Sequence, residues 1–532
     1  MASFNLFSSI CLFVFTFPSL STLSAQSNEE YSFGDIDKWC QTTPHPNQCK
    51  YHLSGGPHDH GPLHRSDFRM LALQAVTRNA NEAQGCAKSL GKMCRTNAAK
   101  AVWNDCYKLL NDTVFQLNQT VTGLKNNQSS DFDAQTWLSA ALTNLQTCFT
   151  GCDEQNLTDF AAPIKSSNLT EMISNTLAIN HKFLNQNSTS NQTDDFPAWV
   201  TRRDRRLLTT ASLQSLANVT VSKAPGSRFP TIQSALDYAG SIDRHNQRFI
   251  IHIKAGVYNE NIDIVNELNN IMFVGDGIRY TIITGNRSAA GGSTTYGSAT
   301  VGVEGSGFIA RGITFRNTAG PQSGQAVALR SSSDLSVYYA CSFEGYQDTL
   351  FTVSQRQFYK LCYISGTVDF IFGNAAVVFQ NCVILVRKPL TGQANTITAQ
   401  GRGDPFQNTG ISIHNCRVMP AVDLTPVVDS VQTYLGRPWQ EYSRTVFMKT
   451  YLDGFVNPKG WLPWGNTDFA FTTLYYGEYG CFGPGSGLEN RVNWTGYHGG
   501  MSLSEAQDFT VDRLIAGRMW LPATGVSFIS GL

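Results

Sequence analysis

The sequence predicts two folded domains, an N-terminal all-α four-helix bundle and a C-terminal all-β right-handed parallel β-helix. At 532 residues the chain is longer than one hydrophobic core ordinarily serves. Apolar residues recur every three to four positions between Tyr31 and Asn191, whereas short β-branched and aromatic runs follow from Val219 onward. We therefore expect a helical domain over residues 26–195, a linker at 196–210 and the β-helix over 211–532.

Residues 1–25 have the composition of a secretory signal peptide. An apolar run from Ile10 to Phe17 precedes small polar residues that end at Ala25, although the basic n-region is missing. A membrane anchor is the alternative, but the run is shorter than the roughly 20 residues that a span needs. No later segment is long and apolar enough to span, so we expect a secreted, extracellular protein without a membrane segment in its mature form.

The cysteines and glycosylation sequons agree with secretion. Removing Cys11 with the signal leaves 12 of the 13 cysteines, an even number for an oxidising compartment. Seven of the N-x-S/T sequons lie before residue 200, which predicts a glycosylated front half. The sequon asparagines are Asn111, Asn118, Asn127, Asn156, Asn168, Asn187, Asn191, Asn218, Asn286 and Asn493.

Four cysteines of the helical part are candidates for structural disulfides. Cys40 and Cys49 flank a short prolyl turn that a local disulfide would close. Cys106 and Cys148 lie on two different predicted helices and could link them. Zinc is the alternative, but no C-x-x-C pair or histidine pair at ligand spacing accompanies them.

The helical part resembles the plant invertase and pectin methylesterase inhibitor family. The resemblance rests on Trp39-Cys40 with Cys49, on Asp105-Cys106-Tyr107, and on the run from Trp137 to Thr143 with Thr147-Cys148. It covers nearly all of this part. Three further cysteines, Cys86, Cys94 and Cys152, depart from the usual pattern of the family.

A basic cluster, Arg202-Arg203-Asp204-Arg205-Arg206-Leu207-Leu208, marks the expected linker. One interpretation is a solvated connection between domains. In a secreted two-domain chain, a dibasic linker is also an accessible protease site. Arg205-Arg206-Leu207-Leu208 resembles the motif at which plant pectin methylesterases are processed, so we expect a processing protease as a partner.

The β-helix is predicted by regular repetition of short strands. Cysteines at equivalent positions are separated by 21, 20 and 34 residues, a period near that of one coil with one inserted loop. A β-sandwich or propeller would instead show hairpin turns such as Asn-Gly. Cys341 with Cys362, and Cys382 with Cys416, could pair between coils or pack as small apolar groups. The expected strand runs are Phe249–Ile253, Ile271–Val274, Thr281–Ile283, Phe308–Phe315, Val337–Phe343, Phe358–Ile364, Val377–Leu385 and Ile411–Val418.

Two aspartates occupy the same phase of successive repeats. Asp348 lies seven residues after Cys341 and Asp369 seven residues after Cys362, so the aspartates are 21 residues apart. Stacked strands would place them roughly 4.8 Å apart. Because two carboxyls this close do not readily both ionise, one can remain an acid while the other attacks as an anion.

Four more residues complete the candidate chemistry. Gln325 and Gln347 are amide donors able to hold an oxyanion. Arg437 can bind a carboxylate in bidentate fashion, and Trp439 offers a flat face on which a sugar can stack. Each of these residues alone is more typical of a surface or core position, but together they indicate an acyl-transfer site.

Three motifs occur in order in this chain, and with them it resembles the plant pectin methylesterases over roughly residues 217–520. The motifs are Gly-Tyr-Gln-Asp-Thr-Leu, Gly-Thr-Val-Asp-Phe-Ile-Phe-Gly-Asn-Ala and Leu-Gly-Arg-Pro-Trp. The resemblance implies that Asp369 attacks the C6 methyl ester of a galacturonate and that Asp348 is the proton donor and later the base. It implies oxyanion stabilisation by Gln325 and Gln347, and orientation of Asp369 by Arg437. It also implies that no metal or cofactor is needed, and it assigns substrate binding to Gln325, Arg437, Trp439, Trp461 and Phe370.

Two other classes of function stay open at this point. A glycoside hydrolase or lyase could use two close carboxyls, although an oxyanion donor beside one of them favours an esterase. The protein could instead be an inhibitor or a catalytically inactive pectin-binding module. Lys+Arg and Asp+Glu balance at 40 each, which gives no sign of nucleic-acid binding. We expect a monomer that binds pectin, with inhibitor proteins as candidate partners and a helical domain that silences the precursor or assists its folding.

Overall fold

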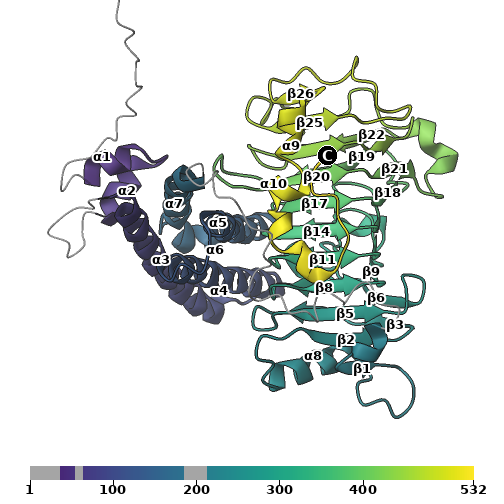
Figure 1. The fold of residues 1–532 in the computed structure, drawn as a ribbon, viewed down its shortest axis with the longest axis horizontal. Helices are drawn as coiled ribbons and strands as arrows, with labels where there is room; N and C mark the ends of the chain where they lie inside the picture. The colour runs from purple at the N-terminus through teal and green to yellow at the C-terminus, as the bar shows by residue number, and fades with distance from the viewer. Residues whose placement is uncertain (1–35, 54–63, 185–212, 466) are drawn as a thin grey trace, which may run out of the picture.

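A computed structural model of the chain describes residues 36–53, 64–184, 213–465 and 467–532 (Figure 1). The expected signal peptide and the Arg205–Leu208 motif lie outside the described residues, as do Asn187 and Asn191.

The N-terminal domain is helical, and its long helices α3, α4, α5 and α7 pack together, as the three-to-four spacing predicts. Side-chain caps set two of the helix starts. Thr96 accepts a hydrogen bond from the Ala99 N–H before α4, and Ser130 forms a capping box with Asp133 before α5. The helices are α1 (Ile36–Gln41), α2 (Pro46–Leu53), α3 (Arg65–Leu90), α4 (Asn97–Lys125), α5 (Asp131–Glu154), α6 (Thr158–Lys165) and α7 (Leu169–Leu184).

Both disulfides proposed for this domain are present. Cys40 is bonded to Cys49, and Cys106 of α4 is bonded to Cys148 of α5. The second bond joins two helices of the bundle core, and both of its cysteines are buried.

The C-terminal domain is a parallel β-helix of three sheets, in which each strand pairs with the equivalent strand of the next coil. The 11-stranded sheet contains, in spatial order, β1 (Val219–Val221), β2 (Phe249–Ile253), β5 (Ile271–Gly275), β8 (Ile309–Arg311), β11 (Ser336–Tyr339), β14 (Arg356–Lys360), β17 (Ala376–Gln380), β20 (Gly410–His414), β23 (Arg444–Met448), β25 (Tyr475–Tyr479) and β26 (Tyr497–Gly499). The eight-stranded sheet contains β24 (Tyr451–Leu452), β21 (Arg417–Pro420), β18 (Val383–Val386), β15 (Tyr363–Gly366), β12 (Ser342–Glu344), β9 (Thr314–Asn317), β6 (Thr281–Gly285) and β3 (Gly256–Asn259). The seven-stranded sheet contains β22 (Thr433–Gly436), β19 (Asn395–Gln400), β16 (Ile371–Gly373), β13 (Leu350–Thr352), β10 (Leu329–Ser331), β7 (Val301–Val303) and β4 (Ile262–Ile264).

Five of the expected strand runs are each two strands with a sharp corner between them. The break follows a residue in the left-handed region, for example Ala340 at φ 50° and Leu361 at φ 55°. Gly312, Asn381 and Asn415 occupy the equivalent position at the other three corners. Glycine and asparagine are residue types that adopt positive φ at low cost. The prediction of single strands was wrong there because β-branched and aromatic residues lie on both sides of the corner.

Equivalent side chains of successive coils stack inside the β-helix. Tyr338 and Tyr359 are partners in strand register, as are Tyr359 and Phe379, and the ring centroids are 4.6 Å apart in both pairs. Offset stacking of this kind adds to the burial of apolar surface that stabilises the core.

The proposed disulfide between Cys341 and Cys362 is absent, and both cysteines are free and buried. Each sulfur faces backbone rather than the other thiol. The Cys362 thiol donates to the Tyr338 carbonyl at 3.2 Å, and the Cys341 thiol donates to the Tyr339 carbonyl at 3.5 Å. Cysteine therefore serves as a small apolar residue after four of the five corners.

Short helices close the β-helix and cover one sheet. α8 (Ile232–Ser241) covers the end near β1 and β2, and residues of the C-terminal helices pack on the 11-stranded sheet (Figure 1). These are α9 (Leu503–Gln507), α10 (Val511–Leu514) and α11 (Leu521–Thr524). The 3₁₀ turns are η1 (Gly91–Met93), η3 (Leu213–Leu216), η4 (Tyr296–Ser298), η5 (Pro321–Ser323), η6 (Thr425–Ser430) and η7 (Gly517–Met519).

The helical domain lies beside the β-helix (Figure 1) and shares a hydrophobic cluster with it. Tyr296, Phe351 and Phe372 of the β-helix domain belong to the same cluster as the core of the bundle. Within the described ranges, no helix is long and apolar enough to cross a membrane.

Candidate active site

The two predicted aspartates occupy equivalent positions on neighbouring coils. Asp348 and Asp369 each stand two residues before a strand, and those strands, β13 and β16, pair with Leu350 opposite Ile371. Both aspartates have positive φ, 61° for Asp348 and 50° for Asp369. Non-glycine residues in this region are uncommon and concentrate at functional sites.

Asp369 is held as a partnered carboxylate. Arg437, directly after β22, donates from Nε to Oδ1 at 2.9 Å and from Nη2 to Oδ2 at 2.6 Å. Thr396 of β19 donates its hydroxyl to Asp369 Oδ1 at 2.6 Å and accepts the Asp369 backbone N–H at 2.9 Å. The arginine fork and the threonine together set the direction in which the carboxylate points.

Asp348 is in the opposite situation. Burial raises the pKa of its carboxyl well above the usual range, and the negative charges of Asp369 and Glu154 raise it further. Among the described residues, no side chain donates a hydrogen bond to this carboxyl. Asp348 is therefore the member of the pair that carries the proton, while Asp369 is partnered by Arg437.

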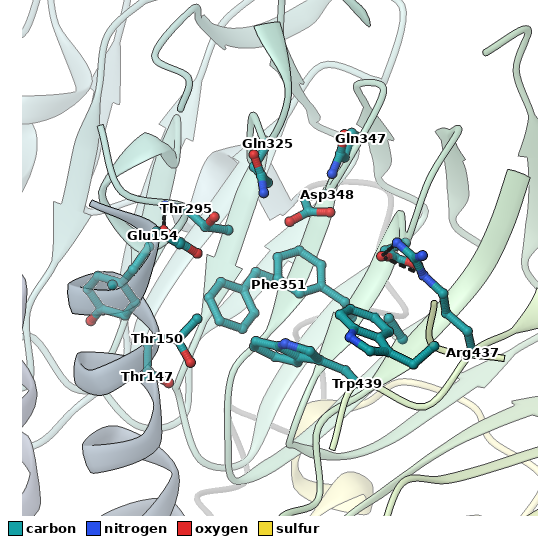
Figure 2. A pocket seen from close by; sticks show the side chains of 16 residues that line it. Thr147, Thr150, Glu154, Thr295, Gln325, Gln347, Asp348, Phe351, Arg437 and Trp439 are labelled. Carbon is teal, nitrogen blue, oxygen red and sulfur yellow. Dashed lines mark hydrogen bonds and ion pairs between the residues drawn. The ribbon is translucent and has the colours of Figure 1, made fainter. Parts of the chain in front are cut away.

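Gln325 and Gln347 line the same cavity, and their amide ends point toward Asp348 (Figure 2). The Ala326 N–H donates to the Gln347 carbonyl at 3.3 Å, so the two glutamines come from neighbouring coils. Neither amide group is hydrogen-bonded to another residue in the described part of the chain. Both N–H groups are thus available to an oxygen placed above the aspartates.

Trp439 lies in the cavity as predicted, but the other two predicted aromatic residues do not. Trp461 is 1% exposed and stacks on Tyr476 in the core of the β-helix, and Phe370 is completely buried there. Their assignment to substrate binding was wrong because their side chains point to the inside of the coil.

The aromatic lining is completed by Trp464, Tyr296, Phe351 and Phe372. The Trp464 ring lies 4.4 Å from the guanidinium carbon of Arg437 and so also supports that side chain. Phe351 and Phe372 stack on each other at 4.2 Å. Alternation along β16 could have identified Phe372, because it is one step out of phase with the inward-facing Ile371.

The cavity has a volume of about 280 Å³, and one of its walls belongs to the helical domain. Thr147, Thr150, Gly151 and Glu154 of α5 line it (Figure 2). These positions recur at three-to-four spacing and form one face of the helix. The Glu154 carboxylate accepts a hydrogen bond from the backbone N–H of Thr295, a residue of the β-helix domain, at 2.9 Å. This wall was not predicted, since the sequence contains no signal for how the domains dock.

Ion pairs hold the two domains together around the cavity. Arg356 of β14 binds Asp334 at 2.6 Å and Asp133, the capping residue of α5, at 2.7 Å. The pKa of Asp133 is lowered, because Arg356 and the hydrogen bonds from Ser130 outweigh the raising effect of burial.

A second set of charges lies between α4 and the β-helix. Lys108 binds Glu304 at 2.7 Å and Asp263 at 3.3 Å. Burial raises the pKa of Asp105 to about 6, and burial and the nearby Glu304 raise the pKa of Asp112 well above its usual range. The interface therefore contains carboxyls that are partly protonated near neutral pH.

Comparison with family models divides the chain in the same way. Residues 218–518 match the model of Pectinesterase, and residues 34–179 match that of Plant invertase/pectin methylesterase inhibitor. The helical part and the strand-rich part correspond to these two matches.

Curated relatives match nearly the whole chain. A probable pectinesterase/pectinesterase inhibitor of Arabidopsis thaliana, number 59, is 52% identical over 93% of this chain and 93% of its own length. Pectinesterase 2 of Citrus sinensis is 52% identical over 94% of this chain and 96% of its own. Among solved structures, a pectin methylesterase from carrot is 51% identical, with a TM-score of 0.58, and covers 59% of this chain and 98% of its own.

Proposed function

The chain belongs to the pectinesterase family and is a carboxylic ester hydrolase with an inhibitor-like helical domain, and on that basis we propose that it cleaves the C6 methyl esters of homogalacturonan through an acyl-enzyme on Asp369. The observation that carries this proposal is the asymmetry of the two aspartates. Arg437 binds and aims the Asp369 carboxyl, whereas burial raises the pKa of the Asp348 carboxyl well above its usual range.

In the first half of the reaction, Asp369 attacks the ester carbonyl carbon. The carbonyl oxygen becomes an oxyanion within reach of the amide N–H groups of Gln325 and Gln347, and donors of this kind typically contribute roughly 10²–10³ in rate. Collapse of the intermediate breaks the bond to the methoxy oxygen. Asp348 gives its proton to that oxygen, so methanol leaves and the galacturonyl group stays on Asp369.

In the second half, the Asp348 carboxylate accepts a proton from water. The resulting hydroxide attacks the acyl carbon, Asp369 departs as a carboxylate, and the galacturonate carries a free carboxyl. Asp348 is again protonated, so no proton is lost from the pair over the cycle.

The shape of the site favours a sugar polymer as the substrate. Trp439 and Trp464 line the cavity together with the two aspartates and the polar side chains of Gln325 and Gln347. Flat aromatic faces suit the apolar faces of pyranose rings. A glycosidase or lyase is less well supported, because neither needs amide donors beside its carboxyls.

We also propose that the helical domain silences the enzyme until the linker is cut. The support is steric and electrostatic, since α5 forms a wall of the cavity that contains both aspartates and brings Glu154 close to Asp348. A role in folding is the second candidate and is compatible with the shared hydrophobic cluster. The position of α5 in the wall of the catalytic cavity favours inhibition.

We also propose that the protein is secreted to the plant cell wall, that it is cleaved at Arg205-Arg206-Leu207-Leu208, and that the mature enzyme is a monomer. The experiment that tests it compares the intact chain with the unit from Thr209 onward on highly methylated pectin. We expect methanol without new reducing ends or unsaturated uronides, and at least about tenfold more of it from the shorter unit. Reducing ends without methanol would overturn the esterase proposal, and equal activity of the two forms would overturn silencing.

A further inference from the structure

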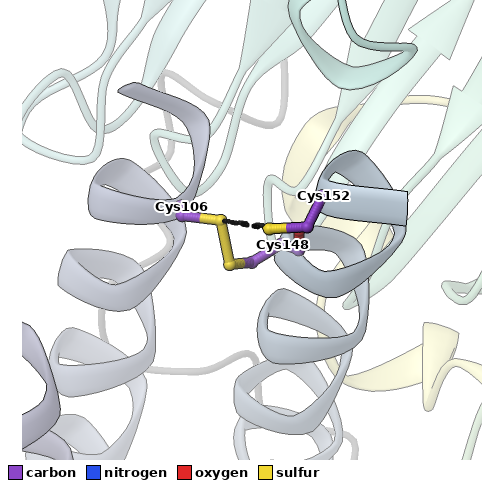
Figure 3. Close-up of side chains that lie close together, drawn as sticks. All are labelled: Cys106, Cys148 and Cys152. Atoms are coloured by element: carbon purple, nitrogen blue, oxygen red, sulfur yellow. Dashed lines mark hydrogen bonds between the residues drawn. A yellow bond between two sulfur atoms is a disulfide. The ribbon is translucent and has the colours of Figure 1, made fainter. Parts of the chain in front are cut away.

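A third thiol lies beside the disulfide that joins α4 to α5. Cys106 is bonded to Cys148, and the sulfur of Cys152 lies 3.9 Å from the sulfur of Cys106 (Figure 3). All three cysteines are buried in the helical domain. The sequence resemblance left Cys152 without a role.

The spacing of the cysteines explains why two of them face the third. Cys148 and Cys152 are four residues apart on α5, so they lie on the same face of the helix, one turn from each other. Cys106 on α4 contacts both of them. A bond to Cys152 would therefore still join the same two helices, one turn further along α5.

The sulfur cluster stands where both helices contact Thr294 and Thr295, the second of which lines the catalytic cavity. Asp105, next to Cys106, accepts a hydrogen bond from the Thr294 hydroxyl. Glu154, two residues after Cys152, accepts the N–H of the adjacent Thr295 at 2.9 Å. The crosslink thus fixes the spacing between two helices that bind consecutive residues of the catalytic domain.

We propose that Cys106, Cys148 and Cys152 form a thiol–disulfide exchange site in which the α4–α5 crosslink is carried by either Cys148 or Cys152. In the exchange, Cys152 loses its proton and its sulfur attacks Cys106 Sγ. The bond between Cys106 and Cys148 breaks, and Cys148 leaves as a thiolate that takes up a proton. One disulfide and one thiol are present before and after, so no oxidant or reductant is consumed.

The exchange is slow in the closed structure. Burial raises the pKa of the Cys152 thiol to about 11, so little thiolate exists at neutral or acidic pH. The disulfide that forms during oxidative folding therefore persists in the closed structure. It can change when α4 and α5 separate or when the pH is alkaline.

The consequence for activity rests on the proposed silencing by the helical domain. Either crosslink keeps α4 and α5 on the cavity rim, so loss of one partner cysteine leaves the intact chain silent. Loss of Cys106, or of both partners, frees the two helices from each other.

The test is a disulfide map of the secreted full chain with Cys148→Ser. Free thiols are alkylated at acid pH, and cleavage after Phe149 separates position 148 from Cys152 for mass spectrometry. We expect Cys106 linked to Cys152 and no alkylated Cys106. Alkylation of both Cys106 and Cys152 would overturn the proposal, as would a bond from Cys106 to Cys86 or Cys94, which are free in this structure.

Wild-type chain provides a second measurement that does not depend on how well a variant folds. Incubation at pH 9 in a glutathione redox buffer should convert a measurable fraction to the Cys106–Cys152 form, whereas Cys152→Ser should show only the Cys106–Cys148 form. Absence of the new pairing in wild type would contradict the exchange. The disulfide map does not measure activity, so its result is independent of the proposed silencing. Methanol release by Cys148→Ser and by Cys148→Ser/Cys152→Ser tests the silencing.

Discussion

Asp348 and Asp369 stand at the same position of two successive coils, and each takes a left-handed backbone conformation, with φ of 61° and 50°. The Asp348 N–H donates to the carbonyl of Val368 at 3.0 Å, which links the two turns directly. Their surroundings nevertheless differ. Arg437 and Thr396 both bind the Asp369 carboxylate, while Asp348 is buried and has no cationic partner in contact within the described part of the chain. The repeated coils thus place the two aspartates at equivalent positions, and the side chains of the next two coils make their surroundings different.

Replacing Arg437 by lysine should lower kcat by about a hundredfold, because an ammonium group cannot make both hydrogen bonds that aim Asp369. Methanol release by the unit from Thr209 onward measures this. Arg417→Lys is the matched control, since Arg417 also stacks on an aromatic ring, Tyr451, but lies away from the cavity. An Arg437→Lys enzyme with unchanged kcat would show that orientation of Asp369 is not limiting.

Lys108→Met should weaken docking of the helical domain and raise the activity of the intact chain severalfold. The substitution removes the cation that α4 places between Glu304 and Asp263 and, among the described residues, leaves those carboxylates only Arg330 as an ion-pair partner. Lys125→Met, at the exposed end of the same helix, should change nothing. Methanol release by the uncut chains measures the effect, and equal basal activities of the two variants would contradict it.

Docking of the helical domain should weaken as pH rises. The pKa of Asp105 is raised to about 6 in the docked state, so that state binds more protons than separated domains in which Asp105 has its ordinary pKa near 4. The proton-linked stabilisation is complete below pH 4 and is lost as pH rises toward 6 and above. After cleavage of the linker, the Kd between the two pieces should be at least about tenfold larger at pH 8 than at pH 4.

Asp105→Asn should reduce that pH dependence, because the amide keeps the hydrogen-bonding shape without titrating. Asp37→Asn, on α1 and away from the β-helix, is the control. A Kd that falls with rising pH would be opposite to the predicted sign.

The β-helix should contain no disulfide. Its cysteines lie in the core or at its edge and are free, so denaturation without a reductant should expose five reactive thiols. Alkylation and mass spectrometry of the unit from Thr209 onward measure the number. Three alkyl adducts instead of five, with two hydrogens fewer on the unmodified pair, would show a disulfide such as the pairing of Cys341 with Cys362 that the sequence allowed.

The repeat made the fold and the central pair predictable. Asp348 and Asp369 were found because equal spacing from Cys341 and Cys362 puts them in one register, and the register of β13 and β16 confirms that reasoning. The spacing between repeats can be determined from the local sequence alone. The prediction of the aspartate pair therefore needs no knowledge of tertiary contacts.

The face on which each aromatic residue lies was not predictable in the same way. Alternation from Ile371 places Phe372 on the cavity face, but it would place Phe370, which precedes β16, on the same face, whereas Phe370 is buried in the core. Trp461 and Trp464 pose the same problem on a loop. Thr396 was missed because an inserted loop precedes β19 and obscures its register with β16.

The measurement that tests the central claim most directly is trapping of the acyl group on Asp369. The Asp348→Asn variant of the unit from Thr209 onward is given an oligogalacturonate ester whose leaving group needs no proton, and hydroxylamine is added after one turnover. We expect a burst of about one equivalent of leaving group, slow turnover thereafter, and a hydroxamate on the peptide that contains Asp369. Steady release without a burst, or a label on any other residue, would contradict nucleophilic attack by Asp369.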